Sequence, residues 1–79
     1  MTKTFTVRGK KIRSASQRRY IVVRVDVVRA TRETMSVHIY KRSDSIATAR
    51  QHARRGGTCI GQTYSTHHIV VDTTTGEEI

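Results

Sequence analysis

Four histidines and a single cysteine carry the most distinctive chemistry in this chain, because imidazole and thiolate groups bind metal ions and exchange protons. His67 and His68 are adjacent, and adjacent residues of a strand point to opposite faces, so these two cannot easily share one ion. Cys59 is isolated, and the sequence contains neither a CxxC nor an HxxxH spacing. We therefore predict no metal site, no cofactor and no catalytic residue, and we interpret Cys59 as a small, buried structural side chain.

The balance of charges points to an anionic partner. Fifteen Lys and Arg residues against six Asp and Glu residues give a formal net charge of +9. Such a charge favours association with polyanions, because condensed counterions are released, and it opposes self-association. The bias is strongest between Lys3 and Arg32, where Asp26 is the only acidic residue. We expect the partner to be a nucleic acid, or an acidic protein or nucleoprotein surface.

Two groups of basic residues are the predicted contacts for this partner. The first group lies in GKKIRSASQRR, residues 9–19, whose composition is typical of a long mobile loop or a hairpin tip. The second lies on a predicted helix, where two arginines four residues apart repel each other unless an anion lies between them. The predicted contacts are Lys10, Lys11, Arg13, Arg18 and Arg19 in the loop, and Arg50 and Arg54 on the helix. The alternative is that these charges only keep exposed strand edges from aggregating. Tyr20 is the best candidate for stacking on a base, but we expect each tyrosine instead to lie at the edge of the core with its hydroxyl group in water.

The apolar residues favour a β-sheet. Val and Ile together number sixteen, Thr numbers twelve and Leu is absent, and side chains branched at the β-carbon fit a pleated surface. YIVVRVDVV, residues 20–28, is the clearest strand, with one fully apolar face and one mixed face. Further strands are predicted in residues 2–7, 35–41, 58–65 and 67–72. The last two of these are joined by a tight turn near Ser65 and Thr66.

One short helix is predicted in RSDSIATARQHARRGG, residues 42–57. A serine or aspartate at its start can cap the unpaired amide groups of the first turn. Ile46, Ala49 and Ala53 fall on one face and form a narrow apolar stripe, and the Gly-Gly pair that follows provides a left-handed stop. The small alanine side chains let such a helix approach a sheet closely.

These elements predict a single domain over residues 1–79. We expect an α+β fold, with a mostly antiparallel sheet of four to five strands and one short helix on one face, in the order β-β-β-α-β-β. The other sheet face, with Val22, Val28 and either Tyr40 or Tyr64, is expected to be uncovered and is a candidate surface for a homodimer or a partner. The sequence has no run approaching the roughly twenty apolar residues that cross a bilayer. With one cysteine and no disulfide framework, we expect a cytoplasmic protein that does not contact membranes.

Residues 45–79, SIATARQHARRGGTCIGQTYSTHHIVVDTTTGEEI, resemble the front half of HicA-type toxin ribonucleases. The resemblance lies in the succession of a helix, a glycine, a strand, a Ser-His-His-like turn and another strand. It implies that His67 corresponds to a histidine implicated in RNA cleavage in that family, where an imidazole exchanges a proton with a ribose hydroxyl or the leaving oxygen. The turn here, Ser65-Thr66, lacks the glycine of the family.

The size and element order of the whole chain also resemble small proteins of phages and mobile elements that block host defence, including some anti-CRISPR proteins. This resemblance implies an inhibitor that binds a protein or a nucleoprotein complex. Our first prediction from the sequence is a non-enzymatic module that binds DNA or RNA through its basic loop and helix. The alternatives are such an inhibitor and a ribonuclease that uses His67.

Overall fold

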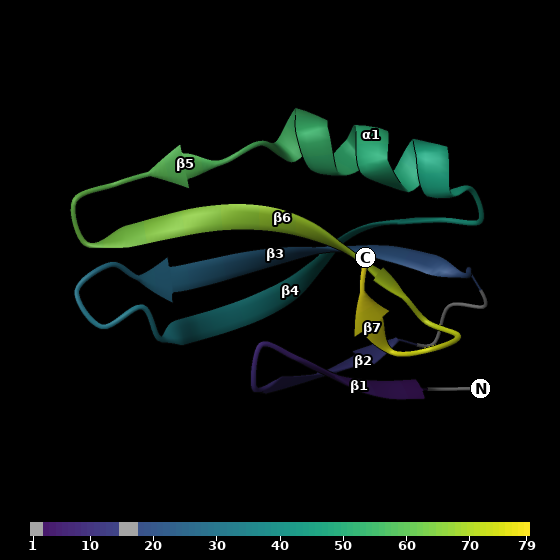
Figure 1. Ribbon diagram of the computed structural model, residues 1–79, viewed down its shortest axis with the longest axis horizontal. Helices are drawn as coiled ribbons and strands as arrows, with labels where there is room; N and C mark the ends of the chain where they lie inside the picture. The colour runs from purple at the N-terminus through teal and green to yellow at the C-terminus, as the bar shows by residue number, and fades with distance from the viewer. Residues whose placement is uncertain (1–2, 15–17) are drawn as a thin grey trace.

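The computed structural model describes residues 3–14 and 18–79, and it shows three layers (Figure 1). In chain order the elements are β1 (Lys3–Val7), β2 (Lys10–Ser14), β3 (Tyr20–Val28), β4 (Thr34–Ser43), α1 (Ile46–Gly56), β5 (Cys59–Ile60), β6 (Tyr64–Asp72) and β7 (Glu77–Glu78). The helix lies on one side of the main sheet and the β1–β2 hairpin on the other. The predicted α+β class, with one helix on an antiparallel sheet, is confirmed. The order β-β-β-β-α-β-β-β contains two strands more than predicted.

The main sheet has the strand order β4-β3-β6-β5, and β7 pairs with the end of β6. Every pairing is antiparallel. Strand β3 lies between two long neighbours, which explains why its apolar run is the clearest strand signal in the sequence. Ile21, Val22, Val23 and Val25 are each 0% exposed, because both faces of β3 are covered. Burial of each such side chain contributes about 1.5–3 kcal/mol of hydrophobic free energy.

Two apolar clusters lie on opposite faces of β3. On the hairpin side, Phe5, Val7 and Ile12 pack against the sheet, and on the helix side Ala49 packs against Val22. The prediction that the face carrying Val22 is uncovered is therefore wrong, because α1 covers this part of it. Val22 cannot contribute to a homodimer surface. Further along β4 and β6, Tyr40 and Tyr64 are 42% and 46% exposed.

The predicted loop over residues 9–19 is also different in the structure. Lys10–Ser14 form β2, which pairs with β1 across the two-residue turn Arg8-Gly9. Ile12 and Ser14 are buried, whereas Lys11 and Arg13 are exposed, so this part of the segment alternates as a strand does. This strand was not predicted, because Ile12 is its only apolar residue and the segment shows no alternation of apolar and polar residues. Residues 15–17, the middle of the predicted loop, lie outside the part that the structure describes.

The turn before β6 comes earlier than predicted. It falls at residues 61–63, and the amide of Gly61 donates to the carbonyl oxygen of Tyr64 at 2.8 Å. Ser65 and Thr66, the predicted turn residues, lie inside β6. The hydroxyl groups of serine and threonine favour turns only weakly. Pairing with β3 along the whole of β6 outweighs this weak preference for a turn.

Helix α1 begins and ends as the sequence predicts. The side chain of Ser45 accepts a hydrogen bond from the amide of Thr48 at 3.3 Å, and Gly57 has a φ of 70° just after the last turn. Ala49 is fully buried against the sheet. Within residues 3–14 and 18–79, no helix is long and apolar enough to span a membrane.

Candidate anion-binding groove

An open groove of about 750 Å³ lies on the hairpin side of the main sheet, where the sheet extends beyond the β1–β2 turn. We call it the end groove. Its lining residues are Arg8, Val27, Arg29, Arg32, Thr34, Thr58, Ser65, His67, His68 and Ile69. Three segments that are distant in sequence therefore contribute to one groove: the β1–β2 turn, the β3–β4 loop and the first half of β6.

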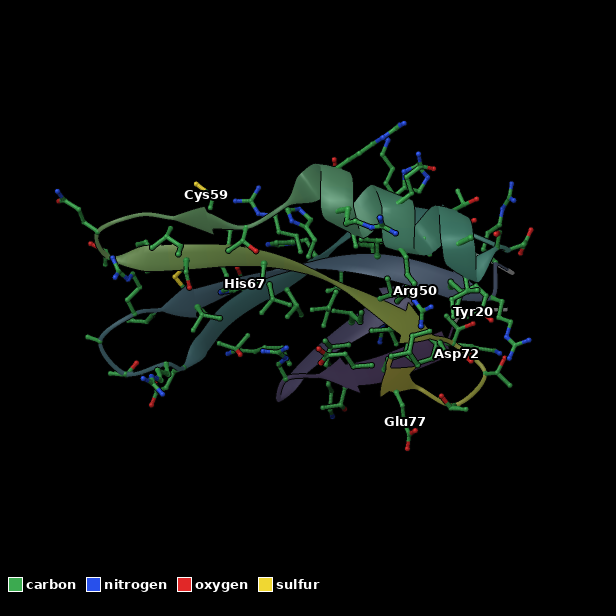
Figure 2. All side chains as sticks on the ribbon, turned by 45° about the horizontal axis from the view of Figure 1, so that its top comes forward. Tyr20, Arg50, Cys59, His67, Asp72 and Glu77 are labelled. Atoms are coloured by element: carbon green, nitrogen blue, oxygen red, sulfur yellow. The ribbon has the colours of Figure 1, made fainter. Side chains whose placement is uncertain are left out.

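Strand register places the β6 residues of this groove. Ser65 and His67 pair with Val27 and Val25, whose side chains face the hairpin, whereas His68 pairs with Arg24 on the helix side. Figure 2 shows His67 and Cys59 toward the same end of the molecule, away from Tyr20, Asp72 and Glu77. Cys59 is exposed, because β5 is a short edge strand, so the prediction that it is a buried side chain is wrong. The prediction that His67 and His68 point to opposite faces agrees with this register. In the described part of the chain, no group of three or more His, Cys, Asp or Glu side chains could hold a metal ion.

Two of the groove arginines occupy unusual backbone conformations. Among the described residues, Arg8, with a φ of 52°, and Arg32, with a φ of 61°, are the two non-glycine residues with positive φ. Gly9 follows Arg8 with a φ of 81°, so both turn residues have the positive φ that a tight hairpin of this twist requires. A left-handed conformation costs an ordinary residue about 1–2 kcal/mol. Such strain is typical of functional positions, and here both strained residues line the same groove.

The three arginines of the end groove have different partners. Arg8 donates two hydrogen bonds to the carboxylate of Glu78, at 3.1 and 2.8 Å, and these bonds raise the pKa of Arg8. Arg29 donates from one Nη atom to the carbonyl oxygen of Gly61 at 2.6 Å, which fixes its position without cancelling its charge. In the part of the chain that the structure describes, neither Arg29 nor Arg32 is ion-paired with a carboxylate.

Neutral polar groups complete the end groove. The Nε2 atom of His67 and the hydroxyl oxygen of Ser65 are 3.0 Å apart and form a hydrogen bond. Thr34 and Thr58 add two more hydroxyl groups to the lining. Guanidinium, hydroxyl and imidazole groups all donate hydrogen bonds, and the described lining residues include no aspartate or glutamate. The groove therefore suits a ligand that is negatively charged and rich in acceptors, such as a phosphate.

A second, smaller groove of about 380 Å³ lies between β2 and β4, and we call it the side groove. Its lining residues are Lys11, Ile12, Arg13, Val37, His38, Ile39 and Arg42. Lys11, Arg13 and Arg42 are all exposed, and none of them has a carboxylate partner among the described residues. The two grooves adjoin the same hairpin, one at its turn and the other along β2, so they form one cationic side of the molecule.

The structure divides the predicted contact residues among three environments. Lys10, Lys11 and Arg13 lie on β2 in the hairpin layer, whereas Arg50 and Arg54 lie on α1 beyond the sheet. The predicted loop and helix groups therefore cannot form one continuous surface.

Arg18 and Arg19, the remaining predicted contacts, pair with acidic residues. Arg18 forms a salt bridge with Asp44 at 2.9 Å, and Arg19 forms one with Asp72 at 3.4 Å. The Arg19 guanidinium also lies 5.2 Å from the ring centroid of Tyr20, which is only 8% exposed. Tyr20 therefore lies in the core, close to the expected edge-of-core position, and its ring is not available to stack on a base, because Arg19 and the core cover it. These two arginines join the residues before β3 to the segment between β4 and α1 and to the end of β6.

Four groove arginines were not predicted from the sequence: Arg42 in the side groove, and Arg8, Arg29 and Arg32 in the end groove. The three of the end groove lie in or beside a turn, and each was counted only in the net charge. A usable signal was present beside Arg8, because a glycine directly after an alternating segment indicates a turn, and the residue before it is then exposed. For Arg29 and Arg32 the sequence offers no signal that their loop lies beside β6 and the hairpin turn.

No protein-family model, no curated protein and no solved structure matches this chain. Its function must therefore be inferred from the geometry and charge of its own residues.

Proposed function

We propose that this protein is a non-enzymatic nucleic-acid-binding module that holds the phosphates of DNA or RNA along the hairpin side of its sheet. One observation carries the proposal. The described residues lining the end groove and the side groove supply arginine, lysine, histidine and hydroxyl donors and no carboxylate. A net charge of +9 strengthens the attraction of a polyanion to this side of the molecule.

The cations that carry binding in this proposal have no ion-pair partners among the described residues. They are Arg29 and Arg32 in the end groove, and Lys11, Arg13 and Arg42 in the side groove. A phosphate that contacts such a side chain releases condensed counterions without first displacing a protein carboxylate. Contacts of this kind position the backbone of a nucleic acid and do not read its bases, so the proposal implies little sequence preference.

Fluorescence anisotropy with labelled duplex DNA, single-stranded DNA and RNA tests this function. We expect binding at low salt, and we expect the double variant Arg29→Ser/Arg32→Ser to weaken it about tenfold or more, since two phosphate contacts are lost. The matched control is Lys3→Ser/Lys41→Ser, which removes two exposed charges from residues that line neither groove. Equal weakening by the two variants would show that only net charge matters and would contradict the grooves as the site.

Failure of the wild-type protein to bind any of the three nucleic acids would refute the proposed function. A stoichiometric complex with a single protein, formed without nucleic acid, would instead support the inhibitor that the sequence also suggested. The affinities measured on the three nucleic acids decide between DNA and RNA as the preferred ligand.

Cleavage of RNA is a second candidate function, and the position of His67 favours it. This histidine lies in the end groove with Arg29 and Arg32 and is hydrogen-bonded to Ser65. An imidazole near neutral pH can accept a proton from a ribose 2′-hydroxyl, and guanidinium groups can stabilise the charge that develops on the phosphate. The candidate requires that purified protein degrades RNA and that His67→Ala abolishes the degradation while RNA binding persists. Intact RNA after long incubation with the wild-type protein would exclude it.

A further inference from the structure

Helix α1 presents a second cationic surface on the side of the molecule opposite the grooves. Arg50, Arg54 and Arg55 are all exposed, and the helix contains no acidic residue. Within the described residues, none of these arginines has a carboxylate within salt-bridge distance. We call these three residues the helix surface.

The position of Arg54 and Arg55 has a local explanation, but the position of Arg50 does not. Arg54 and Arg55 lie in the last turn, where a cation interacts favourably with the negative end of the helix dipole. Arg50 lies in the middle of the helix, one turn before Arg54, where two like charges destabilise the helix slightly. An anion bound between Arg50 and Arg54 removes that repulsion. Thr48 and Gln51 of α1 are also exposed and add hydrogen-bonding side chains to the helix layer.

The main sheet lies between α1 and the β1–β2 hairpin, which contributes to both grooves, and the end groove reaches the helix layer only at Thr58 and His68. The molecule extends 24 Å along the direction in which the three layers stack, which is vertical in Figure 1. At physiological ionic strength the Debye length is about 8 Å, so phosphates bound on opposite sides are screened from each other. Both sides can therefore be occupied at the same time.

We propose that one copy of this protein bridges two duplex nucleic-acid segments, one held along the grooves and the other on the helix surface. The inference rests on the proposed function, because it takes the grooves as one of the two contact surfaces. A single duplex does not reach both surfaces, since its persistence length of about 500 Å is far greater than the 24 Å thickness of the molecule. The second occupant is therefore a separate segment of duplex.

A capture assay tests bridging. Beads carrying one biotinylated duplex are incubated with the protein and with a second, fluorescent duplex, and the fluorescence retained on the beads is measured. We expect the wild-type protein to retain the second duplex. We expect Arg50→Ser/Arg54→Ser to bind a single duplex in anisotropy yet to lower retention about tenfold or more, compared at equal occupancy of the beads. Because these two side chains are exposed, the variant should keep the circular dichroism spectrum of the wild type.

Two further variants test whether retention of the second duplex depends on the two proposed surfaces. Arg29→Ser/Arg32→Ser should also lose retention, because it removes the other surface, whereas Lys3→Ser/Lys41→Ser should keep it. Retention by either surface variant at wild-type levels would mean that bridging comes from self-association, and this would overturn the inference. Single-duplex binding by the wild type without retention would overturn the inference and leave the proposed function standing. Absence of single-duplex binding would also overturn the inference, and only absence of binding to all three nucleic acids would refute the proposed function itself.

Discussion

Arg8 differs from the other two arginines of the end groove because it is already paired. Its guanidinium group holds the carboxylate of Glu78 with two hydrogen bonds at the edge of the groove. The two side chains are 43% and 41% exposed, and an ion pair this open to water contributes only about 0–1 kcal/mol. A phosphate can therefore replace Glu78 as the partner of Arg8 at little cost. Glu78 acts in this account as an internal competitor for the ligand.

Replacing Glu78 with glutamine should strengthen nucleic-acid binding about five- to tenfold at low salt, because Arg8 then gains the capacity for one more phosphate contact. The matched control is Glu77→Gln, which removes the same charge one residue away, where the structure shows no ion pair to Arg8. Anisotropy titrations of both variants measure the difference. Equal gains from the two substitutions would mean that the Arg8–Glu78 pair has no specific role.

At the scale of single residues, the sequence located the cations but not their partners. Arg18 and Arg19 looked like part of a binding arm, yet Asp44 and Asp72 neutralise them. These pairs connect residues 26 and 53 positions apart, and no local pattern reveals a contact at that separation. Conversely, Arg32 was overlooked as a turn residue, although its position in the fold makes it one of the unpaired cations of the groove.

The contact between α1 and β6 is tight at the end of the helix. A Cβ atom built on Gly56 would come within 2.6 Å of the His68 ring, closer than two such carbon atoms can approach. The His68 ring is held from two other directions. Its Nδ1 atom forms a 2.7 Å hydrogen bond with the carbonyl oxygen of Gly57, and the ring makes an edge-on contact with the Tyr40 ring, with 4.7 Å between the two ring centroids. The ring therefore has little freedom to move away.

Gly56→Ala should consequently destabilise the protein by about 1–3 kcal/mol, the usual effect of overpacking. The sign of the change in the free energy of unfolding is informative. Gly56 is helical, and helix propensity alone predicts that alanine at this position stabilises the protein by about 1 kcal/mol. Urea denaturation of Gly56→Ala measures the change in the free energy of unfolding. In the background His68→Ala the same substitution should no longer destabilise. A stabilising effect in the wild-type background would contradict the tight contact.

Asp26 ties three neighbouring strands together. Its carboxylate accepts hydrogen bonds from the hydroxyl groups of Thr66 on β6, at 2.7 Å, and Ser36 on β4, at 2.9 Å. The bond from Thr66 is the largest cause and lowers the pKa of Asp26 below its ordinary value of 3.8. Burial opposes it as the second-largest cause, and the bond from Ser36 and the charge of Arg24 lower the pKa further. The stabilisation is therefore complete above that value and is lost as the pH falls below it.

Asp26→Asn should lower the free energy of unfolding at neutral pH by about 1–3 kcal/mol, because hydrogen bonds to a buried carboxylate are lost. The variant should also lose less stability than the wild type when the pH falls from 5 to about 2, since one group that titrates there is removed. Denaturant titrations across this pH range measure both effects. Asp44→Asn, at an exposed carboxylate, is the control with a smaller effect at neutral pH. A parallel acid dependence of wild type and Asp26→Asn would contradict the role of the cluster.

At the scale of elements, local sequence patterns predicted the helix caps and the central strand, but they missed a strand that forms only through packing. The caps of α1 and the apolar run of β3 are local features, and both were predicted correctly. Strand β2 was missed because a charged segment with one apolar residue becomes a strand only when that residue, Ile12, packs on the sheet beside Phe5. The hairpin and the helix then cover opposite faces of the same sheet, an arrangement that no single segment specifies.

At the scale of the whole molecule, the three layers distribute the charge unevenly. The acidic residues Asp44, Asp72 and Glu78 lie in ion pairs with arginines, whereas both grooves on the hairpin side and the outer side of α1 keep unpaired cations among the described residues. Among the described residues, eight cations without an ion-pair partner thus lie on these two sides, five in the grooves and three on the helix surface. This arrangement supports a role in holding nucleic acid.

The salt dependence of binding tests the central claim most directly. If the five unpaired cations of the two grooves each contact one phosphate of duplex DNA, the logarithm of the association constant should fall with the logarithm of salt concentration with a slope of about −4 to −5. Arg29→Ser/Arg32→Ser should make this slope shallower by about 2, and Lys3→Ser/Lys41→Ser should leave it unchanged. A slope near zero for the wild type, or the same slope for the wild type and the groove variant, would contradict phosphate binding in the grooves.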